Sequence, residues 1–385
     1  MNGPLHVMWV GLRGFPGVQG GVETHAEHLC PMLRDLGCEV TVLTRRGYQP
    51  EAIGPEWHGV RFVNLWAPRH KHLEAVVHTF LAILYAGLVA RPDLLHIQAI
   101  GPGLWTLWAR LLGLRVVVTH HGPDYDRQKW GRLARLVLRL GEASAARWSD
   151  ALIVISKVIQ SDVNSKHGRR GALISNGITL PDGTPDESEV TPFGLVPGRY
   201  VLLVSRLVPE KRHHDLIDAF LRARPDGWKL AIVGGADHAD AYARSVVEAA
   251  RQDERIVFTG FQTGSVLQAL YAEAGLFVLP SSHEGLPIAI LEALSWGVPV
   301  LASDIPANLE VGLPADNYYP LGDLEALSAK LARFAAGTEP ASAREARRQW
   351  AAARFDWQRS ARETVGVYAR VMEGASAWPE ASWGG

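Results

Sequence analysis

Short apolar runs alternate along the whole chain with segments in which apolar residues recur every three or four positions. The runs predict buried strands and the periodic segments predict helices, so their alternation favours parallel sheets covered on both faces. In the first half we expect strands at residues 6–12, 38–45, 94–99, 115–120, 151–155 and 172–175. In the second half we expect them at residues 200–205, 229–233, 256–259, 276–280 and 298–302.

The two series of strands predict an α/β protein with two doubly wound, Rossmann-like domains. A chain of 385 residues also exceeds what one hydrophobic core usually serves. We expect the first domain at 1–180, a linker rich in Pro, Gly, Asp and Glu at 181–198, and the second domain at 199–356. A last helix at 357–373 is expected to pack back on the first domain. Ligands of open α/β sheets bind at the carboxyl ends of the strands, so we expect the domains to face each other across a cleft.

Composition and charge restrict the class of protein. The formal net charge is −1, which gives no overall attraction to nucleic acid. The two cysteines, Cys30 and Cys38, could form at most one disulfide, too few to stabilise a chain of this length. So low a cysteine count is typical of proteins in a reducing compartment. No secretory signal is visible, and the longest apolar stretch, residues 75–90, is too short to span a bilayer and contains His78. We therefore expect a buried helix there, and a cytoplasmic protein that rests at most on the inner face of a membrane.

The strongest candidate site lies in the segment LFVLPSSHEGLPIAILEALSWGVPVLASD, residues 276–304. The pattern predicts a strand, a loop that contains Glu284, and a helix that contains Glu292. Glu292 lies in an otherwise apolar helix, and a carboxylate there needs a partner such as the two hydroxyls of a ribose. The N–H groups of the first helical turn suit a phosphate. In the alternative interpretation, Glu284 caps the helix and Glu292 pairs with an arginine. Between the two glutamates lie Gly285, Leu286 and Pro287.

A second candidate is the motif SRLVPEK, residues 205–211, directly after an expected strand. Arg206 lies at the strand end and Lys211 at the start of the next helix, so both side chains can point at one site. Two cations there can neutralise a diphosphate, with the arginine as a bidentate donor and the lysine as a point charge. Alternatively, both are surface residues that pair with Glu210 or Asp215.

The first strand is followed by a glycine-rich turn, GLRGFPGVQGGVETH. Its glycines do not have the G-x-G-x-x-G spacing of dinucleotide-binding proteins, which disfavours an NAD-dependent oxidoreductase. Gly20 and Gly21 directly precede an amphipathic helix, where they let the backbone approach a phosphate or an acceptor. A tight turn with only a structural role is the alternative.

The segment VVVTHHGPDYD, residues 116–126, ends another expected strand. Either His120 or His121 could hydrogen-bond a sugar hydroxyl, and we expect the other to be a packed histidine. Asp124 and Asp126 imitate the metal-binding DXD motif of GT-A transferases. Two cations of the second domain already serve a diphosphate, so we predict no metal site.

Together these motifs resemble the retaining glycosyltransferases of family 4, in the GT-B superfamily. The resemblance runs through GGVETH, THHG, ISNGI, SRLVPEK and the pair of glutamates with seven residues between them. The stretch GLRGFPGVQGGVETHAEHL is similar to bacterial enzymes that assemble exopolysaccharides and O-antigens. Rhamnosyltransferases of that branch have Glu-Asn where this chain has Glu210 and Lys211, which favours the broader family pattern.

The resemblance implies a role for each matching residue. Arg206 and Lys211 would hold the donor diphosphate, Glu292 the ribose, and Glu284 the donor sugar and phosphates. His121 would lie near the transferred sugar. The catalytic set would be His121, Glu284, Arg206 and Lys211. The donor-binding residues would be Gly20, Gly21, Arg206, Lys211, Glu284, Gly285, Leu286, Pro287 and Glu292.

The resemblance also implies a mechanism without a metal or another cofactor. In the family's usual reaction, the acceptor hydroxyl attacks on the same face as the leaving group, and the departing phosphate takes its proton. The partners would be a nucleotide sugar and a saccharide or polyprenyl-linked saccharide. Two alternatives stay open: a nucleotide-sugar 2-epimerase of the same fold, and a nucleotide- or sugar-binding protein without turnover.

A basic amphipathic segment suggests a further partner. Residues 127–139 carry five basic residues and no acidic one, interleaved with Trp and Leu. The cluster at residues 69–72, RHKH, could extend the same patch. The segment predicts peripheral contact with an anionic membrane. Alternatively, its leucines pack on the sheet and its arginines are only solvated.

Overall fold

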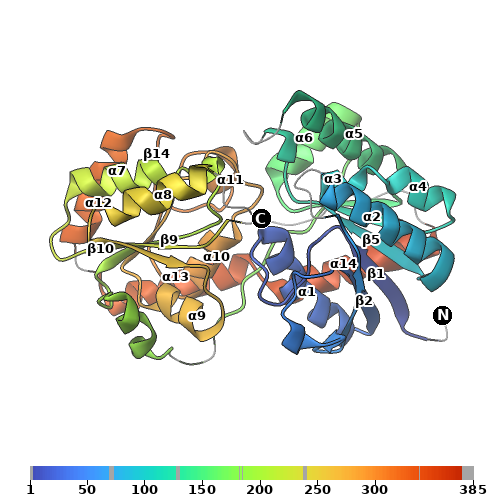
Figure 1. The fold of residues 1–385 in the computed structure, drawn as a ribbon, viewed down its shortest axis with the longest axis horizontal. Coiled ribbons are helices and arrows are strands. Elements are labelled where there is room, and N and C mark those ends of the chain that lie inside the picture. The colour runs from blue at the N-terminus through green and yellow to red at the C-terminus, as the bar shows by residue number, and fades with distance from the viewer. Residues whose placement is uncertain are drawn as a thin grey trace. The chain divides into compact units, whose positions relative to one another are not determined.

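The computed structural model describes residues 3–68, 73–126, 131–181, 183, 185–236, 241–337 and 339–374. The chain divides into unit 1, Met1–Asn176 with Trp357–Gly385, and unit 2, Gly177–Asp356. Each unit is built around its own largely parallel sheet with helices on both faces (Figure 1). The predicted fold class, an α/β protein with two doubly wound sheets, is confirmed.

In unit 1, eight strands among the described residues form one sheet in the order β3-β4-β2-β1-β5-β6-β7-β8. Neighbours pair in parallel, except for the antiparallel hairpin of β3 and β4. Every position of β5, β6 and β7 is buried, which fits strands covered on both faces. The strands are β1 Leu5–Val10, β2 Cys38–Arg45, β3 Glu56–Trp57, β4 Val60–Leu65, β5 Leu94–Gln98, β6 Val116–His120, β7 Ala151–Val154 and β8 Ala172–Leu173.

The helices of unit 1 cover both faces of this sheet, with α1 and α14 on one face and α2, α4, α5 and α6 on the other (Figure 1). The α-helices are α1 Gly21–Asp35, α2 Glu74–Tyr85, α3 Ile100–Gly103, α4 Thr106–Leu111, α5 Arg132–Trp148, α6 Lys157–His167 and α14 Trp357–Glu373. Shorter turns are the 3-10 helices η1 Glu51–Ile53 and η3 Asp124–Asp126 and the π-helix η2 Ala86–Ala90.

The last helix, α14, belongs to unit 1 although it follows unit 2 in the sequence. It packs on α1, and Trp357 and Tyr368 are fully buried in a core that includes Trp9 and Leu29. The Tyr368 hydroxyl and Nδ1 of His96 are hydrogen-bonded at 2.7 Å. A fully buried large apolar side chain contributes about 1.5–3 kcal/mol, so this helix is an integral part of unit 1.

In unit 2, six strands among the described residues form a parallel sheet in the order β11-β10-β9-β12-β13-β14. Helices α7, α8 and α12 cover one face, and α9, α10 and α13 cover the other (Figure 1). The strands are β9 Tyr200–Val204, β10 Lys229–Val233, β11 Ile256–Gly260, β12 Leu276–Leu279, β13 Val300–Ser303 and β14 Tyr318–Tyr319. The α-helices are α7 His213–Ala223, α8 Ala241–Arg251, α9 Gly264–Ala272, α10 Ile288–Ser295, α11 Pro306–Leu309, α12 Leu324–Ala336 and α13 Ala341–Arg354. The 3-10 turns are η4 Glu187–Phe193, η5 Pro209–Lys211 and η6 Ala315–Asn317.

Two segments differ from the expectation. Part of the segment expected to be a linker, residues 181–198, is folded: it contains η4, which packs on α9, and it buries Val190 and Leu195. The apolar stretch at 75–90 is helical, as expected, but it is not buried throughout. At its end, Leu88 and Val89 of η2 are exposed.

Both cysteines are buried free thiols. None of the helices in the described part of the chain is long and apolar enough to cross a membrane.

Candidate functional site

The predicted cations of unit 2 and the loop with Glu284 follow the carboxyl ends of its central strands. Arg206 lies two residues after β9, and the loop with Glu284 follows β12, the neighbour of β9 in the sheet. A 2.8 Å hydrogen bond from the Ser282 N–H to the Glu210 carbonyl joins this loop to η5. The carboxyl edge of the sheet is where open α/β folds bind ligands.

Lys211 and Glu284 form an ion pair across this edge. The distance from Nζ to Oε1 is 2.5 Å, and the side chains are 17% and 11% exposed. Asp215, an alternative partner for Lys211, pairs instead with Arg212. Pro287 occupies the N-cap position of α10, so Glu284 lies before the cap and contacts Lys211. The pair therefore holds one cation and one carboxylate at the place where a donor would bind.

Arg206 is half-buried, and its backbone is fixed on both sides. The N–H groups of Ser205 and Leu207 donate to the carbonyls of Val233 and Gly235 at 3.0 and 2.9 Å. Next to Arg206, the buried Oγ of Ser205 is hydrogen-bonded at 2.9 Å to Nε2 of His213, the first residue of α7. Burial, with the charge of Lys211, lowers the pKa of His213 to about 3, so the ring is neutral near pH 7. This buried network positions the segment that carries both cations.

Glu292 has a partner that the sequence did not suggest. The hydroxyl of Tyr271, on α9, donates a 2.7 Å hydrogen bond to Oε2 of Glu292. Burial, together with the Glu292 charge, raises the pKa of Tyr271, so the hydroxyl stays protonated and acts as the donor. The bond fixes the orientation of a half-buried carboxylate whose expected ligand is a ribose. Tyr271 lies 21 residues before Glu292 and outside any motif, so only the fold reveals it.

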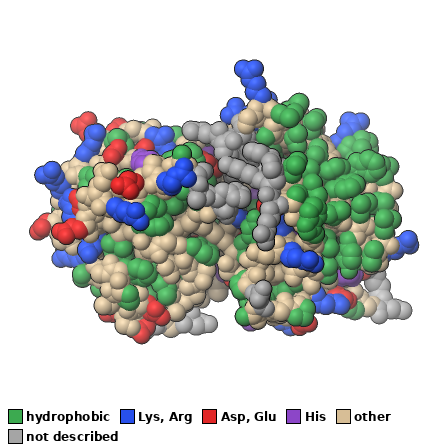
Figure 2. Space-filling model, in the orientation of Figure 1, with side chains coloured by type: hydrophobic (Ala, Val, Ile, Leu, Met, Phe, Trp, Pro, Cys, Tyr) green, Lys and Arg blue, Asp and Glu red, His purple; other side chains and the backbone are tan. Residues whose placement is uncertain are grey.

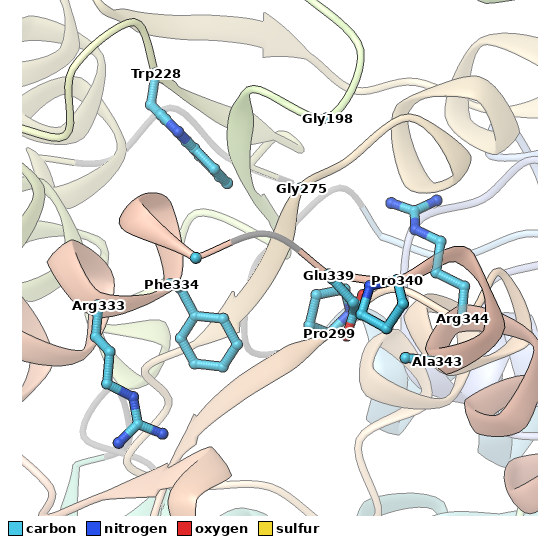
Figure 3. Close-up of a pocket in the computed structure, with 11 residues that line it drawn as sticks. Gly198, Trp228, Gly275, Pro299, Arg333, Phe334, Glu339, Pro340, Ala343 and Arg344 are labelled. Atoms are coloured by element: carbon cyan, nitrogen blue, oxygen red, sulfur yellow. The ribbon is translucent and has the colours of Figure 1, made fainter.

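A hollow in unit 2 does not coincide with this site. It has a volume of about 500 Å³ and is lined by Trp228, Arg333 and Arg344, among others (Figure 3). Its lining residues Gly198, Trp228, Gly275 and Pro299 come one or two positions before β9, β10, β12 and β13. The hollow therefore lies at the amino ends of the strands, away from the carboxyl edge that carries the predicted chemistry.

In unit 1, the glycine-rich turn is fastened to α1. Arg13 donates to Oε1 of Glu23 through Nε at 3.0 Å and through its N–H at 3.2 Å, and it also donates to the Gln19 carbonyl. Gly20 has φ of +154°, and an added Cβ there would lie 2.1 Å from Oε2 of Glu23. Glycine is therefore required at this position, directly before the first residue of α1, Gly21.

The two adjacent histidines have different environments. His120 is buried: the Gly122 N–H donates to its Nδ1 at 3.1 Å, so Nε2 carries the proton and donates to Glu142 at 2.9 Å. His121 is half-buried, and its Nε2 lies 2.8 Å from Oε1 of Gln98. Burial and the neighbouring histidines lower the pKa of His121, so its ring is neutral near pH 7. His120 is thus the packed histidine, and His121 is the candidate for contact with a substrate.

The DYD segment is tied to the same buried network. Tyr125 is buried, and its hydroxyl donates to Glu142 at 3.1 Å and accepts from Lys166 at 2.7 Å. Burial opposes ionisation of Glu142, but hydrogen bonds from His120 and His167 outweigh it and lower its pKa to about 2. Within the described residues, no group of three His, Cys, Asp or Glu side chains could hold a metal ion.

Comparison with known proteins places this geometry in a family. The sequence model described as Glycosyltransferase Family 4 matches residues 19–180, and that described as Glycosyl transferases group 1 matches residues 198–336. The chain belongs to the family 4 glycosyltransferases. The first match contains Gly20, Gly21 and His121, and the second contains the cations and glutamates of unit 2.

Curated relatives of this glycosyltransferase include enzymes of polysaccharide metabolism. It is 27% identical to the glycogen synthase of Mycobacterium tuberculosis over 96% of each chain. It is 29% identical to an exopolysaccharide phosphotransferase of Streptomyces coelicolor, over 60% of this chain. That match spans only 24% of the longer Streptomyces protein. These relatives do not favour the epimerase or the binding-protein alternative.

Solved structures support the same architecture for the glycosyltransferase. HepE from Anabaena, solved in complex with UDP and glucose, superposes with a TM-score of 0.79 at 19% identity. The alignment covers 95% of this chain and 99% of HepE. The predicted GT-B fold is thereby confirmed.

Proposed function

We propose that this glycosyltransferase moves a sugar from a nucleoside diphosphate sugar to a saccharide or lipid-linked saccharide, with retention of anomeric configuration, in the synthesis of a cell-surface polysaccharide. The observation that carries the proposal is the Lys211–Glu284 pair at the carboxyl edge of unit 2, where Arg206 follows β9 and the loop with Glu284 leads into α10, the helix of Glu292. A nucleoside diphosphate sugar consists of a base, a ribose, a diphosphate and a sugar. The two cations match the diphosphate, the Glu292 carboxylate matches the ribose hydroxyls, and the loop with Glu284 matches the sugar.

In this proposal Arg206 and Lys211 bind the diphosphate and stabilise the negative charge that grows as the bond to the sugar breaks. Glu292, oriented by Tyr271, accepts hydrogen bonds from the ribose hydroxyls. The acceptor oxygen forms the new bond to the anomeric carbon on the face that the diphosphate leaves. The acceptor's proton passes to the departing phosphate, so no protein base is required. Most of the rate enhancement then comes from positioning and charge stabilisation.

The relatives support a saccharide as the acceptor, and the basic region of unit 1 bears on whether that saccharide is linked to a lipid. The two curated relatives are named for glycogen and exopolysaccharide, which supports a saccharide acceptor. A polyprenyl-linked saccharide would bring the enzyme to the inner face of a membrane through the region of 127–139. Residues 127–130 of that region, and the basic cluster at 69–72, lie outside the described residues.

A thermal-shift screen with UDP, GDP, ADP and dTDP and their sugars would test the proposal. A ligand at 100 times its Kd should stabilise the protein by about 2.7 kcal/mol, which is enough to rank the nucleotides. With the selected donor, NMR of the product should show a retained anomeric configuration. Glu284→Ala should lower the rate for the bound donor, whereas Glu248→Ala, on the exposed part of α8, should not. An inverted product, or no nucleotide that binds, would contradict the proposal.

A further inference from the structure

Unit 1 exposes an unusual number of large apolar side chains on three neighbouring elements: η2, α4 and α5. Each of these side chains is between 52% and 76% exposed. From η2 and α4 they are Leu88, Val89, Trp108 and Leu111. From α5 they are Leu133, Leu136 and Leu140. We call these seven residues the docking face.

The docking face is one continuous region. Helix α4 contacts both α2, which continues into η2, and α5. Leu88 and Leu111 line the same shallow hollow of about 450 Å³. Figure 2 shows hydrophobic side chains gathered over the side of unit 1 where α2, α4 and α5 lie. Exposed apolar surface of this extent usually marks a site of interaction with a partner.

The charged side chains on the three elements of the docking face are mostly positive, although Arg110 of α4 is paired with Asp150. The residues of η2, α4 and α5 include five arginines and a single acidic residue, Glu142, which is buried with His120. On α5, the arginines at 132, 135 and 139 form an exposed stripe beside the stripe of leucines at 133, 136 and 140. Helical spacing brings each stripe to one side of the helix. An occupant must therefore accept apolar side chains and offer negative charge next to them.

We propose that the docking face binds the surface of an anionic phospholipid bilayer. Leucine, valine and tryptophan side chains would enter the boundary between headgroups and acyl chains, and the arginine stripe would contact the phosphates. A second copy of the chain fits less well, because a symmetric contact would bring the arginines of both copies together without exposed carboxylates on these elements to pair with them.

This proposal depends on the proposed function in one respect only: the role of membrane binding would be to bring the enzyme to a lipid-linked acceptor. Vesicle binding needs neither donor nor acceptor, so it can fail while sugar transfer to a soluble saccharide succeeds, or succeed while transfer fails.

The test is co-sedimentation of the full chain with phosphatidylglycerol-containing vesicles and with pure phosphatidylcholine vesicles, at low and high salt. We expect binding to the anionic vesicles that weakens with salt, since screening shortens the reach of the arginines. The variant Arg132→Ser/Arg135→Ser/Arg139→Ser should bind roughly a hundredfold more weakly, since each basic residue near an anionic surface contributes about 1 kcal/mol. Leu133→Ser/Leu136→Ser/Leu140→Ser should lose binding even at low salt.

The matched control is Arg222→Ser/Arg244→Ser/Arg251→Ser, which removes the same charge from exposed positions on α7 and α8 of unit 2. It should bind vesicles like the wild type, and circular dichroism should show all variants folded. Equal binding to neutral vesicles, or equal losses in the two arginine variants, would overturn the proposal. So would a wild-type dimer in light scattering that the leucine variant converts to a monomer, because the face would then bind a second copy.

Discussion

At the scale of single residues, the hydrogen bond from Tyr271 to Glu292 allows the orientation of the carboxylate to be tested separately from its presence. Tyr271→Phe removes only the hydroxyl that orients the carboxylate, and a neutral hydrogen bond is worth about 0.5–1.5 kcal/mol. We therefore expect nucleotide affinity to fall roughly two- to tenfold in Tyr271→Phe and further in Glu292→Ala. Calorimetric titration with the nucleotide would measure both.

The matched control for this change is Tyr318→Phe, also in unit 2. The Tyr318 hydroxyl donates to the Asn308 carbonyl and accepts from the Leu313 N–H, both at 3.0 Å. If Tyr318→Phe weakened nucleotide binding as much as Tyr271→Phe does, a specific role for the Tyr271 contact would be refuted.

The metal prediction also belongs to individual residues. Because Arg206 and Lys211 supply positive charge for the diphosphate, transfer should survive EDTA, and Asp124→Ala/Asp126→Ala should keep its donor affinity. The assay is sugar transfer before and after chelation. Complete loss of transfer in EDTA, restored by Mn²⁺, would show that the DYD segment binds a catalytic metal.

Individual contacts were only partly predictable from the sequence. Lys211 and Glu284 could be predicted to meet because each follows a strand, and the carboxyl ends of parallel strands share an edge. Tyr271 and Gln98 could not be predicted, because each reaches its partner across the fold from 21 or 23 residues away. The choice between His120 and His121 depended on Glu142, which only the packing of α5 brings to His120.

At the scale of elements, the glycine-rich turn before α1 gives a controlled comparison. Gly17 and Gly20 both have positive φ, but an added Cβ at Gly17 meets nothing within 4 Å, whereas at Gly20 it meets Glu23. Gly20→Ala should therefore disturb the Arg13–Glu23 contact and lower kcat/KM by up to about 100-fold, the loss that a misplacement of about 1 Å can cause. Gly17→Ala should cost only the strain of its backbone, about 1–3 kcal/mol of stability.

Steady-state kinetics and thermal melts of the two glycine variants would separate loss of function from loss of fold. Equal kcat/KM in Gly20→Ala and Gly17→Ala would mean that the turn has only a structural role, the alternative that the sequence left open.

Elements with strong apolar runs were predicted well, and short or irregular ones were not. Strand β2 has the expected bounds, because nearly every residue of Cys38–Arg45 is buried. The strands β3 and β14 have two residues each, too few for a pattern to register. The 3-10 helix η4 was missed because its Pro- and Glu-rich sequence lacks periodicity, although Val190 anchors it.

At the scale of the whole molecule, buried histidines predict that stability depends on pH. Burial lowers the pKa of His25 and His78 to about 4 and that of His213 to about 3. In the unfolded chain a histidine has a pKa near 6.5, so between pH 6.5 and about 4 the unfolded state binds more protons. These groups stabilise the fold fully above pH 6.5, and the contribution is lost as pH falls, by up to about 1.36 kcal/mol per unit for each histidine.

Urea unfolding at pH 7.5, 6 and 5 would check this. His213→Gln should reduce the slope of stability against pH in this range, whereas His58→Asn, at an exposed position, should leave it unchanged. A slope that is the same in wild type and His213→Gln would contradict the assignment of a neutral, buried His213.

The central claim for the whole molecule is that a nucleoside diphosphate binds at the carboxyl edge of unit 2. The most direct test is calorimetric titration of the nucleotide selected by the thermal-shift screen into wild type and Arg206→Ala. Hydrogen bonds to charged groups contribute about 1.5–3 kcal/mol, so we expect one nucleotide per wild-type chain and roughly 10- to 100-fold weaker binding in the variant. Equal affinity of the folded Arg206→Ala variant, or no nucleotide binding by the wild type, would contradict the account.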